Sequence, residues 1–145
     1  MMALEPALEQ FFNTYQRLNR DNLDLLGGIY SDDIRFSDPA HSLKGLPALR
    51  DYFAELYANV EQIRFDFSAP RISNDQVFVQ WVMRLRHPRL NRGGEIEVPG
   101  ISCLHFAENG LVDDHRDYFD LGLLLYEQLP LLGPLVRAVK RRFSA

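Results

Sequence analysis

Cysteine is nearly absent from this sequence, since Cys103 is the only one in 145 residues. A single thiol cannot close a disulfide within the chain, so the cysteine content gives no sign of an oxidising compartment. The first ten residues, MMALEPALEQ, carry acids where a secretory signal has a basic segment followed by an apolar run. We therefore expect a cytoplasmic protein.

Long apolar runs are also missing. The longest, near residues 121–136, is interrupted by Glu127, Pro130 and Pro134, so no integral membrane segment is expected. Positive charge is scarce as well, because the formal net charge is −4 and no basic patch precedes the last ten residues. Since nucleic-acid affinity comes mainly from neutralising phosphates, we expect no nucleic-acid partner.

Several catalytic motifs are missing too. The histidines, at His41, His87, His105 and His115, lack the spacing of metal ligands, so no metal is expected. The chain has no GxSxG elbow, no phosphate-binding glycine loop and no dinucleotide fingerprint. No cofactor is expected for these reasons.

The sequence is rich, by contrast, in aromatic side chains and regular periodicity. Ten phenylalanines, six tyrosines and one tryptophan suit a large core or a roomy apolar cavity. Apolar residues recur at helical spacing over residues 4–18 and 46–60. Alternation of apolar and polar residues predicts strands at 34–38, 63–69, 77–85, 96–106 and 111–119.

The order of these elements predicts the fold class. A helix, a strand and a second helix precede a meander of strands, which is typical of α+β domains. Short turns such as Asn109-Gly110 favour antiparallel pairing of the later strands. A strongly curved antiparallel sheet wrapped around the N-terminal helices would enclose a cone-shaped cavity.

The first predicted strand ends on a charge. Asp38 shares the parity of Ile34 and Phe36, so its carboxylate is expected to point inward, directly before Pro39. An apolar cavity disfavours the charged form of a carboxylate, which makes it a more effective base. The alternative is an Asp that forms an Asx-type turn, which is common before proline.

Three segments resemble the NTF2-like (SnoaL-like) superfamily, which includes ketosteroid isomerase and polyketide cyclases. They are LDLLGGIYSDDIRFSDP, KGLPALRDYFAEL and LHFAENGLVDDHRDYFD. The resemblance implies an NTF2-like domain over residues 1–120, with a ligand pocket in the mouth of a cone-like α+β barrel. It also implies a homodimer.

The resemblance assigns roles to single positions. Asp38 falls where ketosteroid isomerase-like sequences have their general base. Ser102 stands where they have an oxyanion-binding acid, and a hydroxyl is a weaker partner for an oxyanion. Thr14 stands at their oxyanion tyrosine, with Tyr15 one position later. These departures argue against steroid isomerisation itself.

A second group of ionisable residues lies on the last predicted strand. His115, Asp117 and Phe119 share one face of it, and the resemblance turns that face toward the cavity. A histidine and an aspartate two residues apart on one face are close enough for contact, and polyketide cyclase-like relatives use such a pair for proton abstraction. The alternative is a polar rim or an ion-pair network with Arg116.

Further residues are expected to line the cavity and bind ligand: Tyr15, Phe36, Trp81, Ser102 and Phe119. For Tyr15 and Trp81 the alternative is packing in the core or cavity wall. Epoxide-hydrolase relatives need an Asp-Arg-Asp set, and the arginines of the strands, Arg84, Arg86 and Arg116, have outward parity. Cys103 and His105 also have outward parity.

Residues 121–145 form a predicted C-terminal helical extension. Leu121, Leu124, Leu125 and Leu129 make an apolar stripe, and basic residues follow Pro134. We expect the extension to pack on the same domain or at a dimer contact, and an anionic membrane is the alternative partner for it.

These observations lead to two functional hypotheses. The first is a SnoaL-like isomerase or cyclase that takes a small hydrophobic substrate. Asp38 would abstract a proton next to a carbonyl, while His115 with Asp117 would return it or polarise the oxygen. The second is a non-catalytic module that binds a hydrophobic ligand or mediates dimerisation.

Overall fold

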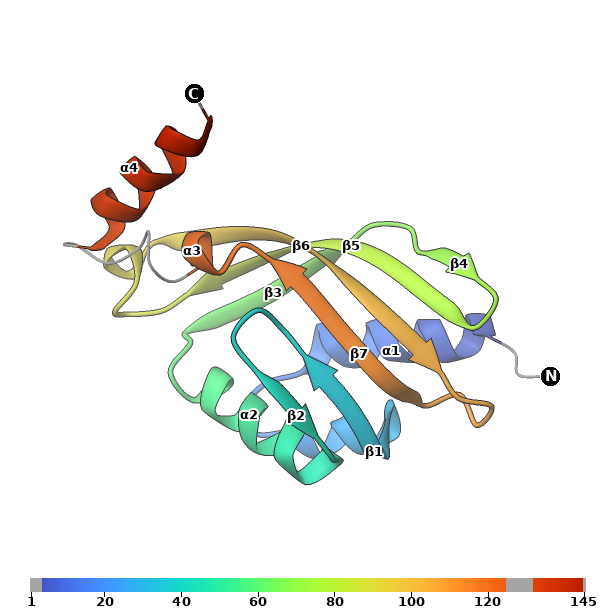
Figure 1. The fold of residues 1–145 in the computed structure, drawn as a ribbon. Coiled ribbons are helices and arrows are strands. Elements are labelled where there is room, and N and C mark those ends of the chain that lie inside the picture. Colours follow the sequence, from blue (N-terminus) through green and yellow to red (C-terminus); the bar gives the residue numbers. More distant parts are fainter. Residues whose placement is uncertain (1–3, 125–131, 145) are drawn as a thin grey trace.

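The computed structural model describes residues 4–124 and 132–144, in which a curved, unclosed sheet wraps around helices α1 and α2 (Figure 1). The elements in chain order are α1 (Leu4–Arg17), η1 (Leu23–Gly28), β1 (Tyr30–Ser37), β2 (Ser42–Lys44), α2 (Leu46–Ala58), β3 (Gln62–Phe67), β4 (Arg71–Ser73), β5 (Gln76–Arg86), η2 (Asn91–Gly93), β6 (Glu95–Phe106), β7 (Val112–Phe119), α3 (Leu121–Leu124) and α4 (Leu132–Ser144). The predicted α+β class is confirmed.

The sheet has the strand order β2-β1-β7-β6-β5-β3, with the short β4 paired to β5. The long strands β5, β6 and β7 form the predicted antiparallel meander. The turn between β6 and β7 uses Gly110 with φ +83°, the backbone region that glycine adopts without strain.

One pairing differs from the all-antiparallel expectation, because β1 runs parallel to β7. These strands are separated in the chain by α2 and the whole meander, so no hairpin forces them to be antiparallel. Phe36 pairs with His115 and Ser37 with Arg116. The parallel register carries both strands toward the same end of the sheet, which places Asp38 and Asp117 in one region.

The core lies between the helices and the concave face of the sheet. Inward residues of β5 are buried as their parity predicts, and so is the apolar stripe of α1. The α1 and α2 residues Phe11, Tyr15 and Phe53 pack their rings against one another or against strand residues. A cavity lies beside these rings.

The C-terminal extension is described in two pieces, α3 and α4. Leu121 and Leu124 are half-buried in α3, whereas Leu125 and Leu129 lie outside the described residues. Helix α4 projects from one end of the sheet (Figure 1), and its Lys140 forms an ion pair with Asp120 directly after β7. Among the described helices, none is long and apolar enough to cross a membrane.

Candidate active site

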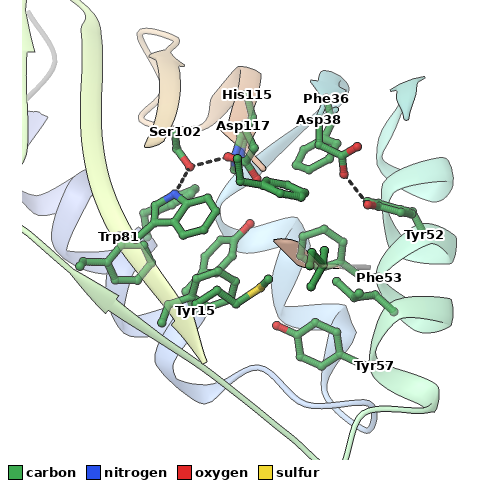
Figure 2. Close-up of a pocket in the computed structure, with 17 residues that line it drawn as sticks. Tyr15, Phe36, Asp38, Tyr52, Phe53, Tyr57, Trp81, Ser102, His115 and Asp117 are labelled. Carbon is green, nitrogen blue, oxygen red and sulfur yellow. Dashed lines mark hydrogen bonds and ion pairs between the residues drawn. The ribbon is translucent and has the colours of Figure 1, made fainter. Parts of the chain in front are cut away.

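A cavity opens between the concave face of the sheet, α1 and α2. It is lined by 17 residues, most of them aromatic, and offers about 70 Å³ to the centre of a water molecule (Figure 2). That space suits a few waters or a small ligand. Every residue that the sequence placed in the site lies on this wall: Tyr15, Phe36, Asp38, Trp81, Ser102, His115, Asp117 and Phe119.

The carboxylate of Asp117 is held by two donors on one oxygen. Nε2 of His115 lies 2.6 Å from its Oδ1, and the Ser102 hydroxyl donates to the same atom at 2.5 Å. Ser102 in turn accepts the Trp81 indole N–H at 2.8 Å. No described residue donates to Oδ2 of Asp117, whose side chain is 18% exposed. One carboxylate oxygen is therefore anchored, and the other accepts no hydrogen bond from the described residues.

The far side of the His115 ring contacts two tyrosines. Its Nδ1 lies 2.7 Å from the Tyr30 hydroxyl, which lies 2.5 Å from the Tyr15 hydroxyl. Burial raises the pKa of Tyr15 and Tyr30 well above the ordinary tyrosine value, so both hydroxyls keep their protons. Together with Trp81 and Ser102 they complete one hydrogen-bonded network around the His115–Asp117 pair.

A neutral His115 with its proton on Nε2 satisfies this whole network. Tyr15 then donates to Tyr30, Tyr30 donates to Nδ1, and Nε2–H donates to Asp117. Each O–H and N–H then has an acceptor, and the chain of hydrogen bonds runs from Tyr15 through Tyr30 and His115 to the carboxylate of Asp117. In an imidazolium, Nδ1–H would reverse the tyrosine pair and leave the Tyr15 proton without an acceptor in the network.

Asp38 both forms an Asx-type turn and lies on the cavity wall, so the two placements considered from the sequence are compatible. Its Oδ1 accepts the backbone N–H groups of Ala40 and His41 at 2.8 Å each, which is an Asx turn. Its Oδ2 accepts the Tyr52 hydroxyl, and the side chain is only 4% exposed on the cavity wall. Burial, and then the Asp38 hydrogen bond, raise the pKa of Tyr52, which stays a neutral donor.

Three tyrosines of the site were missed by the sequence analysis, Tyr30, Tyr52 and Tyr57, the last of which lines the cavity with a hydroxyl that has no acceptor among the described residues. Tyr30 has the same parity as Ile34 and Phe36, so the inward row of β1 extended backwards could have found it. Tyr52 lies three residues after Leu49, at the edge of the apolar stripe of α2. Its inward position could have been read from that spacing.

The basic residues of the strands lie outside the cavity, as predicted. Arg84 pairs with Asp66 and Glu97, and the Arg116 guanidinium lies 5.2 Å from the centre of the Tyr118 ring. Among the described lining residues there is no lysine or arginine. The Asp-Arg-Asp arrangement is therefore not formed here by the described residues.

Comparison with known proteins agrees with this geometry. The sequence model of the SnoaL-like domain matches residues 8–115. The chain belongs to the SnoaL-like domain family. The match includes Asp38, Ser102 and His115 and stops just before Asp117. A comparison of this SnoaL-like protein with curated proteins gives no match.

Solved structures share the fold. A putative SnoaL-like polyketide cyclase from Jannaschia sp. CCS1 is 15% identical, with a TM-score of 0.72 over 86% of this chain and 93% of that one. A protein with a ketosteroid isomerase-like fold from Catenulispora acidiphila, in complex with trimethylamine, is 17% identical, with a TM-score of 0.73 over 88% and 96%. An LEH-like epoxide hydrolase from M. tuberculosis is 17% identical, with a TM-score of 0.65 over 93% and 94%. At such identities the likeness establishes the fold alone.

Proposed function

We propose that this SnoaL-like protein is a cofactor-independent isomerase or cyclase that moves a proton next to a carbonyl group of a small, mostly apolar substrate. The observation that carries this proposal is the asymmetric carboxylate of Asp117. Two donors fix its Oδ1, while Oδ2 accepts no hydrogen bond from the described residues. A base that is rigidly positioned and open on one side is what proton abstraction requires.

We assign the proton-accepting role to Asp117 rather than to Asp38. Three donors already occupy the Asp38 carboxylate, namely two backbone N–H groups and the Tyr52 hydroxyl. A carboxylate has about four lone-pair positions, so Asp38 has less room for a substrate proton. Asp38 with Tyr52 then forms a second polar group of the cavity, which orients the substrate.

The proton balance of the reaction is simple. Oδ2 of Asp117 takes the proton from the carbon next to the carbonyl, and the C–H electrons form an enolate. In an isomerisation the carboxylic acid of Asp117 returns this proton to another carbon. In a cyclisation the enolate carbon attacks a second carbonyl, and the new alkoxide receives the proton. His115 holds Asp117 in place throughout.

The structural neighbours support a ligand of small size. One of them, with a ketosteroid isomerase-like fold, holds trimethylamine, a molecule of few atoms. The cavity of this chain offers about 70 Å³ to the centre of a water molecule, which suits a small ligand.

Exchange of substrate protons with solvent tests the proposal directly. Small ketones and aldehydes that bind the protein would be incubated with it in D2O, and loss of the proton next to the carbonyl would be followed by NMR. Asp117→Asn keeps the Oδ1 acceptor and removes the base, so exchange should fall about 100-fold or more. Asp24→Asn, exposed on η1 and outside the cavity lining, is the control and should keep the wild-type rate.

Asp38→Asn distinguishes the role of the Asp38 carboxylate from that of Asp117. Asparagine keeps the acceptor of the Asx turn, so we expect a smaller loss, about tenfold. Full activity in Asp117→Asn would sink the proposed mechanism. Binding of carbonyl compounds without any exchange would instead establish the non-catalytic ligand-binding module.

We also propose a homodimer formed through the outer face of the sheet. Ile101 and Cys103 are only half-buried there, and Tyr118 is 49% exposed beside Arg116. Asp114 and Arg116 give this face charges of both signs, which suits pairing with a second copy. Sedimentation should show a dimer that Ile101→Arg converts to monomer, and a monomeric wild type would contradict it.

A further inference from the structure

We propose that the ligand of this cavity carries a protonated amine, held beside Asp38 and Tyr52 within a cluster of aromatic rings. The proposal deepens the proposed function, since it names the substrate class of the same site. The substrate would be a small apolar ammonium compound that also bears the reacting carbonyl.

The charge of the cavity wall favours a cationic ligand. Asp38 and Asp117 lie on the wall, and the described lining residues include no lysine or arginine. Of these two carboxylates His115 contacts only that of Asp117, so it can offset at most one of the two charges. His41 is near Asp38, with 3.5 Å from Nδ1 to Oδ1, but it is outside the cavity lining and 53% exposed. A buried charge that lacks a cationic partner favours a cationic ligand.

The direction of the hydrogen bonds is the second argument. Tyr52 gives its proton to Asp38, Ser102 gives its proton to Asp117, and Trp81 gives its N–H to Ser102. The oxygens of Tyr52 and Asp117 therefore present lone pairs to the cavity. Of the described lining hydroxyls only that of Tyr57 has no acceptor, so a ligand that can only accept hydrogen bonds finds a single donor, whereas an ammonium group brings donors of its own to the carboxylates.

The aromatic rings near Asp38 are the third argument. Phe36, Tyr52 and Phe53 are mutually adjacent, with ring centroids 5.8 to 6.0 Å apart, and Figure 2 shows them beside the Asp38 carboxylate. Aromatic faces attract alkylammonium cations within about 6 Å of the ring centre. Rings and a buried carboxylate together recognise both the apolar groups and the charge of such a ligand.

A cationic substrate also resolves a difficulty of the proposed chemistry. Proton abstraction by Asp117 leaves a negative enolate oxygen, and the wall offers only the Tyr57 hydroxyl as a donor whose proton has no acceptor among the described residues. An ammonium group within the same substrate offsets the enolate charge, because opposite charges attract strongly at short range in a water-poor site. The substrate then adds to the stabilisation that the single donor of the wall can supply.

Three probes of nearly equal shape test the charge preference without any turnover: tert-butylammonium, tert-butanol and pivalate. Trp81 is the only tryptophan of the chain and lines the cavity, so its fluorescence reports binding. We expect the ammonium to bind at least about tenfold more tightly than the alcohol, with pivalate weakest. Asp38→Asn should reduce the preference for the cation to below about threefold, while Asp24→Asn, exposed on η1, should keep it.

The results separate this proposal from the proposed function. Equal or tighter binding of the alcohol or pivalate overturns it, as does a cation preference that survives in Asp38→Asn. No binding of the ammonium up to about 10 mM also overturns it. Proton exchange in a neutral ketone, together with no cation preference, would reject the ligand class and leave the proton-transfer function standing. Cation binding without proton exchange in any carbonyl compound would reject the proton-transfer function and leave the ligand class standing.

Discussion

The hydroxyl of Tyr30 lies 2.7 Å from Nδ1 of His115, and both side chains are almost fully buried. The two residues are 85 positions apart and meet because β1 and β7 are neighbouring strands of the sheet. This contact fixes which nitrogen of His115 faces Asp117. It also connects Tyr15 to the carboxylate that we propose as the base.

Removing the Tyr30 hydroxyl should destabilise the protein. Tyr30→Phe leaves Nδ1 of His115 without a donor and the Tyr15 hydroxyl without its acceptor, so the free energy of unfolding should fall by about 1–3 kcal/mol. Urea unfolding measures this, and the ¹⁵N shifts of His115 should show loss of the single Nε2–H tautomer. Tyr118→Phe, on the exposed outer face, is the control and should change stability by less than about 0.5 kcal/mol. Unchanged stability and tautomer in Tyr30→Phe would contradict the network.

Gly100 is required for the position of Trp81. The two residues are opposite each other on β6 and β5, and a Cβ at Gly100 would overlap the indole ring. Gly100→Ala should therefore move Trp81, weaken its bond to Ser102 and cost about 1–3 kcal/mol of stability. A shift in the emission of this single tryptophan measures the movement.

Gly27→Ala is the matched control for that substitution. A Cβ at Gly27 would lie 3.6 Å from Leu46, which is ordinary contact. We expect its emission spectrum to match the wild type. Identical spectra and stability in Gly100→Ala would show that the wall tolerates the methyl group.

Stability should depend on pH through His105 on the outer face. Its Nδ1 lies 2.5 Å from Asp113 and its Nε2 lies 2.7 Å from Asp75, and these hydrogen bonds, that to Asp113 first, raise the pKa of His105. A raised folded-state pKa gives stability that is complete below the ordinary value of 6.5 and is lost as pH rises through the folded value. The bond to His105 lowers the pKa of Asp75, whose contribution is lost as pH falls below about 4.

The difference in unfolding free energy between wild type and His105→Gln measures this contribution. We expect it to be largest between about pH 4 and 6.5 and to decline toward pH 9. A difference that grows as pH rises would show that His105 is neutral in the folded protein.

Helix α4 should be held to the domain partly by charge. Asp120 pairs with Lys140, which lowers the pKa of Asp120, and it also accepts the backbone N–H of Leu123. Asp120→Asn keeps the second acceptor and removes the charge, so hydrogen exchange in residues 132–144 should accelerate. Global stability should change by less than about 1 kcal/mol, because both side chains are partly exposed. High salt should produce the same acceleration in the wild type, and equal exchange in all three conditions would contradict the role of this pair.

Much of the fold follows from the sequence alone. Apolar residues that recur about every 3.6 positions indicate a helix, and those that recur every second position indicate a strand. These patterns were enough to predict α1, α2 and the β5–β7 meander. The same parity predicted that Asp38, His115 and Asp117 lie on inward faces, and the family resemblance predicted that these faces line one cavity. All three line it.

The tertiary structure decided what periodicity does not encode. The parallel pairing of β1 with β7 joins segments that are remote in the chain, so the period within each strand cannot specify it. The hydrogen bonds from Tyr30 to His115 and from Tyr52 to Asp38 depend on side-chain directions across that register. The sequence determined that charged groups face a cavity, whereas only their packing in three dimensions decided which carboxylate oxygen is left open.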